Sequence, residues 1–521
     1  DADLVRQYLE REVESLDVSW DDLVAHGFIN AEKRVFWLPA FAMRFSSHVN
    51  AVSKLHRDVS RRMWSSLFPE RPETEIPVGY VTNGVHYSWV SEPINQLLER
   101  HIGPDYVRCP DRPERWAEVL GVDDEEMWQA HHRNKQSLIT FIRKKLADDL
   151  AARGYVEPKI LKLTRALNPE YLTIVFARRF ARYKRPTLIL KDKDRLAKIL
   201  SNSTKPVQLI FAGKAHPADS LGKSMIKEIV DFAKTYELED RVVFVENYDI
   251  NVARHLVWGA DVWLNNPIRE NEASGTSGMK AALNGVLNMS VLDGWWPEAY
   301  NGKNGWAITG AGYHSQLEMQ EAAEAAQIYD LIEESITESF YDRNEAGVPV
   351  RWTEMMKESI SSVGCRFNMG RVFAEYTDKL YMPATTALDA LTRENYASLR
   401  HALRSMQEVQ TYWDRIAIGG LATSVDKKEV VTEGERVKIT CELRLHGAPP
   451  DLFTVELFCL LHDQNEHKII PMRPRNVGTV AIVFECEFEM AGRGLFSMNA
   501  RIKPASPILQ DLYPEMVKWA Q

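Results

Sequence analysis

The sequence of 521 residues contains little cysteine, no long hydrophobic run and no excess of positive charge. Its five cysteines are scattered and include no C-x-x-C pair, which argues against a disulfide framework or a zinc site and favours reduced thiols. No run of about eighteen apolar residues occurs, and the start shows no signal-peptide pattern, so we expect a cytoplasmic protein without a membrane partner. The net charge of −9 argues against a general nucleic-acid binder.

The middle of the chain alternates between apolar runs and amphipathic helical patterns such as Thr187–Leu200 and Leu221–Tyr236. The runs are typical of strands buried on both faces: Leu172–Ala177, Val207–Ala212, Val242–Val245, Asp261–Leu264 and Val286–Val291. This alternation predicts an α/β fold with a doubly wound parallel sheet. Such sheets bind ligands at the carboxyl ends of their strands.

The segment Glu-Ala-Ser-Gly-Thr-Ser-Gly-Met-Lys at 272–280 follows the fourth of these runs. Gly275 and Gly278 allow a tight turn into a short helix, which we expect to end at Asn284-Gly285. Backbone N–H groups at such a turn suit a phosphate group, and Lys280 lies in the first turns of the helix. The pattern therefore predicts a phosphorylated cofactor held by a lysine, with a βα turn and a solvated lysine as the alternative.

This segment resembles the pyridoxal-phosphate attachment segment of the α-glucan phosphorylases, the family of glycogen, starch and maltodextrin phosphorylases. Three further segments resemble that family in the same order. Thr82–Gly84 is similar to the segment with its sugar-binding asparagine, Arg178–Arg185 to its basic phosphate segment, and Glu246–Tyr248 to its cofactor-contact tyrosine motif. The resemblance covers about residues 1–380.

The resemblance implies a role for each matching residue. Lys280 corresponds to the Schiff-base lysine, and Arg178, where the family usually has lysine, corresponds to a ligand of the cofactor phosphate. The expected cofactor-binding residues are Lys280, Arg178, Tyr248, Gly275, Thr276 and Ser277. The expected catalytic residues are Lys280, Arg179, Lys184 and Glu272, and the expected sugar-binding residues are Asn83, Glu272, Ala273, Ser274 and Gly275. No metal site is expected.

The activity implied is pyridoxal-phosphate-dependent phosphorolysis of an α-1,4-glucan to glucose 1-phosphate, by a hexosyltransferase of the phosphorylase type. The family also implies inorganic phosphate as a substrate, allosteric control and a homo-oligomer. One alternative is a nucleotide-sugar-dependent glucan synthase of the same fold, which has no need of Lys280. The other is a non-catalytic glucan-binding fragment.

The two ends of the chain differ from the middle. Residues 1–80 read as helices, including one whose face carries Val49, Val52, Leu55 and His56 and which runs to about Leu67. After a long helix at about Arg393–Ile416, alternation of apolar and polar residues predicts a β-sandwich over 421–505. We therefore expect domains at 1–84, 85–420 and 421–521. By the resemblance, they form a two-lobed glycosyltransferase (GT-B-like) fold whose N-terminal lobe is mostly absent from this chain.

The histidines match the family poorly. Ser47 takes the place of a family histidine and His48 lies one residue away, which rotates a helical side chain by about 100°. His48 therefore has no assigned role. His131 and His132 are expected at the surface.

Overall fold

The computed structural model describes residues 2–16, 18–29, 35–108, 112–155, 165–310, 312, 316–424, 432–461, 466–477, 481–490 and 496–521. They form two compact units. The sheet unit contains Asn50–Asp58 and Tyr80–Thr377, and the sandwich unit contains Asp1–Val49, Val59–Gly79 and Asp378–Gln521. All residues expected in the site belong to the sheet unit.

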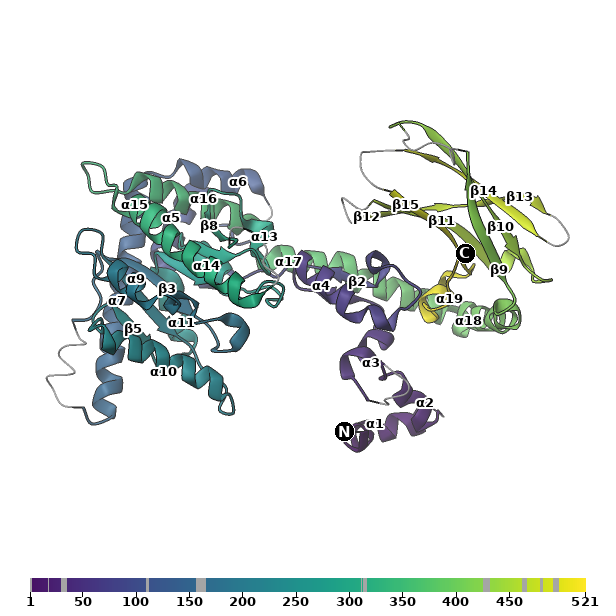
Figure 1. The fold of residues 1–521 in the computed structure, drawn as a ribbon, viewed down its shortest axis with the longest axis horizontal. Helices are drawn as coiled ribbons and strands as arrows, with labels where there is room; N and C mark the ends of the chain where they lie inside the picture. The colour runs from purple at the N-terminus through teal and green to yellow at the C-terminus, as the bar shows by residue number, and fades with distance from the viewer. Residues whose placement is uncertain are drawn as a thin grey trace. The chain divides into compact units, whose positions relative to one another are not determined.

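A six-stranded sheet organises the sheet unit (Figure 1). Its strands are β3 (Leu172–Ala177), β4 (Val207–Ala212), β5 (Val242–Val245), β6 (Val262–Asn265), β7 (Leu287–Val291) and β8 (Gly305–Ile308). The order is β5-β4-β3-β6-β7-β8 and every pairing is parallel. The prediction of a doubly wound parallel sheet is confirmed, and β8 is a strand that the apolar runs did not reveal.

Helices cover both faces of this sheet (Figure 1). The sheet unit contains α5 (Glu92–Ile102), α6 (Pro113–Ala117), α7 (Asp124–Ala152), α9 (Lys193–Leu200), α10 (Ser220–Thr235), α11 (Ile250–Gly259), α12 (Ser277–Ala282), α13 (Trp296–Ala299), α14 (Leu317–Leu331), α15 (Thr337–Tyr341), α16 (Val350–Arg366) and α17 (Met369–Tyr376). Along β3, Leu172, Ile174 and Phe176 pack with α9, α10, α14 and α16, whereas Val175 and Ala177 pack with α7 and α11. Because alternate strand residues point to opposite faces, a strand covered twice must be apolar throughout.

Three helices that follow strands begin with the same type of cap. Asp192, Asp219 and Asp249 each accept a hydrogen bond from the backbone N–H three residues later, at 2.9, 2.8 and 2.8 Å. A side-chain oxygen at this position satisfies an N–H that the helix itself leaves unpaired. The caps therefore determine where α9, α10 and α11 start.

The sandwich unit contains two four-stranded sheets, β13-β14-β10-β9 and β12-β11-β15-β16 (Figure 1). Its strands are β9 (Ala417–Thr423), β10 (Arg436–Arg444), β11 (Phe453–Leu461), β12 (Glu466–Pro471), β13 (Arg473–Val477), β14 (Ile482–Glu489), β15 (Phe496–Pro504) and β16 (Lys518–Trp519). Its helices are α1 (Ala2–Leu16), α2 (Trp20–Ala25), α3 (Leu38–Phe45), α18 (Met382–Trp413) and α19 (Pro507–Leu512). The alternating residues Val437, Ile439, Cys441 and Leu443 are buried in the shared core, as the period of two predicts.

Arg501 of β15 links the sandwich to the segment Val59–Gly79. Its buried guanidinium pairs with Glu75 and, at 2.9 Å, with Glu456, and it lies near the rings of Phe458 and Trp519. A buried arginine needs such partners, because an unpaired charge in the interior is costly. These contacts hold strand β15 of the sandwich against the segment Val59–Gly79.

The helix expected from Val49 to Leu67 is wrong at its beginning. Val49–Ala51 is a strand, β1, and the helix α4 is Lys54–Trp64, followed by a 3₁₀ turn. The reason is Ser53, whose hydroxyl accepts the N–H of His56 at 3.1 Å and thereby caps the helix. A second short strand, β2, is Val78–Tyr80.

The helix expected over Arg393–Ile416 also differs. The structure has α18 from Met382 to Trp413, with non-helical backbone at Arg393–Tyr396. Glu394, Asn395 and Tyr396 have φ values of 49°, 52° and 62°, which lie outside the helical region. The helical pattern is thus split into two segments at the point where we expected its start.

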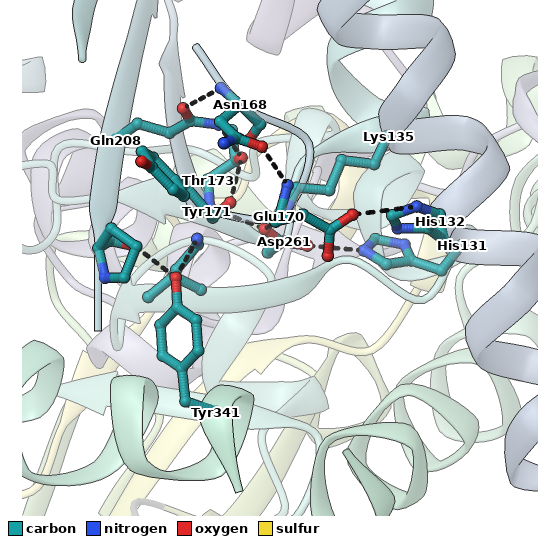
Figure 2. A network of polar contacts seen from close by, with 12 residues as sticks. His131, His132, Lys135, Asn168, Glu170, Tyr171, Thr173, Gln208, Asp261 and Tyr341 are labelled. Carbon is teal, nitrogen blue, oxygen red and sulfur yellow. Dashed lines mark hydrogen bonds and ion pairs between the residues drawn. The ribbon is translucent and has the colours of Figure 1, made fainter. Parts of the chain in front are cut away.

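A buried polar network joins α7 to the amino ends of β3 and β6 (Figure 2). The carboxylate of Asp261 accepts hydrogen bonds from His131 Nε2 at 2.8 Å, Lys135 Nζ at 2.5 Å and the Thr173 N–H at 2.7 Å. Against the cost of burial, Lys135 and His131 hold the pKa of Asp261 below its usual value. The expectation that His131 lies at the surface is therefore wrong, since this side chain is fully buried.

His132 is partly exposed and lies beside this network. Its Nε2 lies 3.4 Å from Glu170 and 2.9 Å from Gln136 Nε2, so it is not a free surface histidine either. Two adjacent histidines on a helix point about 100° apart, which explains why only one of them reaches the sheet.

No helix of the described residues is long and apolar enough to cross a lipid bilayer.

We expect Lys135→Met to destabilise the sheet unit by about 3–5 kcal/mol, because it leaves the buried Asp261 carboxylate without its main counter-charge. Urea unfolding followed by circular dichroism measures the change. The matched control is Lys191→Met, which removes a partly exposed lysine 3.3 Å from Glu321 and should change stability little. Equal losses in the two variants would contradict the role assigned to Asp261.

Candidate active site

The site lies where the strand connections diverge, between β3 and β6. The chain leaves β3 toward β4 on one side and leaves β6 toward β7 on the other, which opens a crevice at the carboxyl ends of these strands. The loop Arg178–Arg185 follows β3, and the loop from Asn266 to Thr276 follows β6. The Ile268 N–H donates to the Tyr183 carbonyl at 2.7 Å, which fastens the two loops together.

Glu272 is paired with two cations of the β3 loop. Its carboxylate oxygens accept hydrogen bonds from Arg178 Nη2 and Lys184 Nζ, and the three residues are 6%, 8% and 7% exposed. Burial disfavours the charged carboxylate, but the two cations hold the pKa of Glu272 below its usual value. The loop therefore keeps one negative and two positive charges in a largely water-free place.

The Arg178 guanidinium has one nitrogen that can still donate a hydrogen bond. Its Nη1 is buried and has no hydrogen-bond partner among the described residues. Burial raises the pKa of Tyr248, and the positive charge of Arg178 partly opposes that rise, so the phenol lies within electrostatic range of the guanidinium. A buried donor without a partner is costly, which makes this position suited to an anion.

Lys280 has a different environment. Its Nζ lies 3.7 Å from the centre of the Trp89 ring. Burial lowers the pKa of Lys280, and no charged group among the described residues offsets this effect. Trp89 is held by its carbonyl, which accepts from Trp258 Nε1 at 2.7 Å and Asn284 Nδ2 at 2.9 Å. An amine in such a place loses its proton more easily than one in water.

The turn that leads into α12 depends on glycine. Gly275 has a φ of 76°, a conformation that side chains with a Cβ rarely adopt. A Cβ on Gly278 would collide with the Asn288 amide, so this glycine allows the turn to approach β7. The Ser274 carbonyl accepts the Trp295 N–H at 3.0 Å, and Trp263 Nε1 donates to Ser277 Oγ at 3.2 Å.

Asp293 is a site residue that the sequence reasoning missed. This fully buried carboxylate accepts the N–H groups of Glu272 at 3.0 Å and Gly294 at 2.8 Å. Burial raises its pKa to about 6 despite these bonds, with the nearby Glu272 adding to the rise. The signal available in the sequence was an Asp-Gly pair directly after an apolar run, at the same edge of the sheet as Glu272.

Arg185 and Glu324 were also missed. Arg185 has a φ of 48°, and its buried guanidinium pairs with Glu324 and donates to the carbonyls of Asn266 at 2.9 Å and Pro267 at 2.7 Å. Asn266 Nδ2 donates in return to the Arg185 carbonyl at 2.9 Å. These bonds hold the loop that carries Lys184 in one conformation.

The remaining expected residues lie around this cluster without joining it. The Arg179 side chain is exposed and donates to the Tyr183 hydroxyl at 3.3 Å. Asn83 is half-buried, and Ala273 is exposed, with its carbonyl accepting from Ser53 Oγ at 2.7 Å. The structure thus brings Arg178, Lys184 and Glu272 together and leaves the Arg179 guanidinium outside their ion-pair cluster.

The fold and these residues define a doubly wound α/β protein with a cation cluster at the ligand edge of its sheet. Residues 5–334 match the family model of carbohydrate phosphorylases, and residues 413–521 match that of the glycogen phosphorylase C-terminal domain. The first match covers more than half of the chain. The chain belongs to the carbohydrate phosphorylase family, and the resemblance inferred from four short segments is confirmed.

Individual relatives agree with this assignment. The glycogen phosphorylase of Aquifex aeolicus (strain VF5) is 46% identical over 342 residues, which are 65% of this chain and 48% of the relative. The maltodextrin phosphorylase of Thermococcus litoralis is 41% identical over 424 residues, 81% of this chain and 49% of the relative. For the glycogen phosphorylase of Mycobacterium tuberculosis (strain H37Rv) the values are 36% over 422 residues, 81% and 48%. The chain spans about half the length of these curated relatives.

We expect phosphate to stabilise the variant Glu272→Gln more than the unchanged protein. Near pH 7 Glu272 is ionised, because folding lowers its pKa. Its contribution to the stability of the folded state is fully present above the ordinary glutamate pKa and is lost as the pH falls through the lower pKa of the folded state. The variant leaves Arg178 and Lys184 without their counter-charge, so a bound anion replaces it and raises the unfolding temperature. Thermal unfolding with increasing phosphate measures the shift.

Sodium chloride at equal ionic strength serves as the control for screening. In the double variant Glu272→Gln/Lys184→Met, the extra gain from phosphate should shrink. Equal shifts with phosphate and chloride would show that these cations do not form an anion site.

Proposed function

We propose that this chain forms the cofactor- and phosphate-binding part of an α-glucan phosphorylase. Such a hexosyltransferase uses inorganic phosphate to release glucose 1-phosphate from an α-1,4-glucan. The observation that carries the proposal is the cluster of Arg178, Lys184 and Glu272 at the point where β3 and β6 diverge. The names of the relatives, which include glycogen and maltodextrin phosphorylases, support the choice of reaction.

Pyridoxal phosphate fits the residues of this site. A phosphate group needs donors and positive charge, and Arg178 Nη1 is a buried donor without a partner in the described part of the chain. A covalent link needs an uncharged amine, and burial lowers the pKa of Lys280. We infer that Lys280 attaches the cofactor, that Tyr248 lies against it, and that Arg178, Thr276 and Ser277 hold its phosphate. When bound, this 5′-phosphate supplies an acid–base partner for the substrate phosphate.

The other residues bind the reactants. Two phosphates held in contact repel each other strongly, and positive charge must offset that repulsion. Arg179 and Lys184 supply it on the substrate side. Because Lys184 also pairs with Glu272, a phosphate bound here shares the Lys184 ammonium with that carboxylate.

The sugar is bound on the side of the β6 loop. We infer that Asn83 and Glu272 contact its hydroxyl groups and that the backbone of Ala273, Ser274 and Gly275 donates hydrogen bonds to them. Asp293 contributes indirectly, since it holds the Glu272 backbone in place. In the alternative of a nucleotide-sugar-dependent synthase, Lys280 has no role.

We expect borohydride reduction of the cofactor-supplemented protein to label Lys280, as found by peptide mass mapping. Lys280→Ala should lose the label and the associated absorbance, because Lys280 combines partial burial with a position just after the turn that leads into α12. Lys303→Ala, which changes an exposed lysine, should keep both. A label on another lysine, or none in freshly supplemented protein, would refute the proposed cofactor role.

A two-lobed fold of the GT-B type follows from the same proposal. The curated relatives are about twice as long as the chain, and a closed cleft between two lobes protects the reaction from water. In the sandwich unit, Trp37, Leu38 and Phe45 of the α3 region are 48%, 68% and 57% exposed. Apolar side chains this exposed are suited to contact with a further lobe.

We therefore expect residues 1–521 alone to bind pyridoxal phosphate but to form little glucose 1-phosphate from glucan and phosphate. Addition of a polypeptide equivalent to the half of the relatives that this chain does not cover, fused or separate, should give phosphorolysis. Release of glucose and of glucose 1-phosphate is measured in parallel, since an open cleft favours water as the acceptor. Full phosphorolysis by the isolated chain would contradict the need for a second lobe.

A further inference from the structure

Thr82, the residue before Asn83, is buried and bound to a carboxylate. It is 5% exposed, and its Oγ1 lies 3.0 and 2.9 Å from the two carboxylate oxygens of Glu298. A hydroxyl has one proton and a carboxylate only accepts, so Thr82 is the donor in this contact. Such a charge-assisted hydrogen bond is stronger than a neutral one and fixes the Thr82 side chain.

Glu298 binds a second segment at the same time. Its Oε1 accepts the Lys54 N–H at 2.9 Å, at the start of α4. The Asn83 N–H donates to the Val52 carbonyl at 3.0 Å, so the segments around residues 52–54 and 82–83 are joined both by Glu298 and by each other. A single carboxylate on the short helix α13 thus connects parts of the sheet unit that lie far apart in the sequence.

The peptide groups on both sides of Asn83 are fixed as well. Arg371 Nη2 donates to the carbonyls of Thr82 at 2.6 Å and Asn83 at 3.2 Å. A Cβ on Gly84 would lie 2.5 Å from the Asn368 carbonyl oxygen, so the chain passes close to the start of α17. With its backbone held on each side, the direction in which the Asn83 Cα–Cβ bond leaves the chain is fixed.

The stretch that carries Glu298 also holds the opposite side of the proposed sugar site. Asp293 accepts the Glu272 N–H at 3.0 Å, and the Trp295 N–H donates to the Ser274 carbonyl at 3.0 Å. Residues 293–298 therefore contact the segment of Asn83 and the loop of Glu272 alike. A displacement of either would alter the distance between the two groups assigned to the sugar.

We propose that Glu298 is a positioning residue that sets the orientation of Asn83 through Thr82 and so determines how tightly the site holds the hexose. The inference rests on the proposed function, because it assigns Asn83 to the sugar. Glu298 and Thr82 do not touch the reactants themselves. Their contribution appears only through Asn83, and this dependence makes the inference testable.

The test uses the chain combined with the second lobe and with cofactor, assayed in the direction of glucan elongation with varied glucose 1-phosphate. We expect Thr82→Val, which removes the hydrogen bond, to raise the KM for glucose 1-phosphate about tenfold, with a smaller change in kcat. Glu298→Gln keeps a neutral acceptor and only weakens the bond, so it should raise this KM by a smaller factor, about threefold. Thr82→Ser keeps the hydroxyl and should restore the unchanged KM. Cofactor content, measured by absorbance, should be the same in all variants.

A double-mutant cycle with Asn83→Ala separates positioning from a general loss of structure. If Thr82 acts through Asn83, then Thr82→Val has no further effect on KM in the Asn83→Ala background. Additive effects, or a normal KM in both Thr82→Val and Glu298→Gln, would overturn the inference. If Thr82→Val does not fold, the same cycle with Glu298→Gln decides the question. Absence of both glucan elongation and phosphorolysis when the unchanged chain is combined with the second lobe would instead contradict the proposed function itself.

Discussion

The pairing of β3 with β6 is the constraint on which the site depends. These strands lie side by side in the sheet although about ninety residues separate them in the chain. At their amino ends, Asp261 accepts the Thr173 N–H and binds Lys135, which ties α7 to the pair. At their carboxyl ends, Arg178 and Lys184 meet Glu272. Ionic clusters thus hold both ends of the same strand pair. The pairing of the strands fixes the relative positions of the two loops at the carboxyl ends.

The two clusters differ in their balance of charge, although each has one buried nitrogen without a partner among the described residues. In the cluster of Asp261, one lysine neutralises one carboxylate, both fully buried, and the unpartnered nitrogen is His131 Nδ1. In the cluster of Glu272, two cations share one carboxylate, and Arg178 Nη1 remains without a partner among the residues described. An excess of positive charge in a dry place is unfavourable on its own and favourable once an anion arrives. This excess of positive charge distinguishes the cluster of Glu272 from the balanced ion pair of Lys135 and Asp261.

Much of this site follows from the sequence. Leu172–Ala177 and Val207–Ala212 are strands with the predicted boundaries, because a strand covered on both faces must be continuously apolar. The basic loop and the glycine-containing turn were placed correctly at strand ends. Other features were not predicted. Ser53 makes α4 start later than predicted, and His131 was expected at the surface, because neither a cap nor a buried ion pair leaves a periodic pattern.

The sequence by itself determined the doubly wound sheet, the order of the motifs and the residue types assigned to phosphate and cofactor. These properties depend on local pattern and on residue chemistry, both of which can be read along the chain. Only the tertiary structure decided that Glu272 neutralises Arg178 and Lys184, that Asp293 holds Glu272, and that Glu298 reaches Thr82. Each of these contacts joins residues from different segments of the chain, and their energies depend on burial and distance, which exist only after the sheet has brought the loops together.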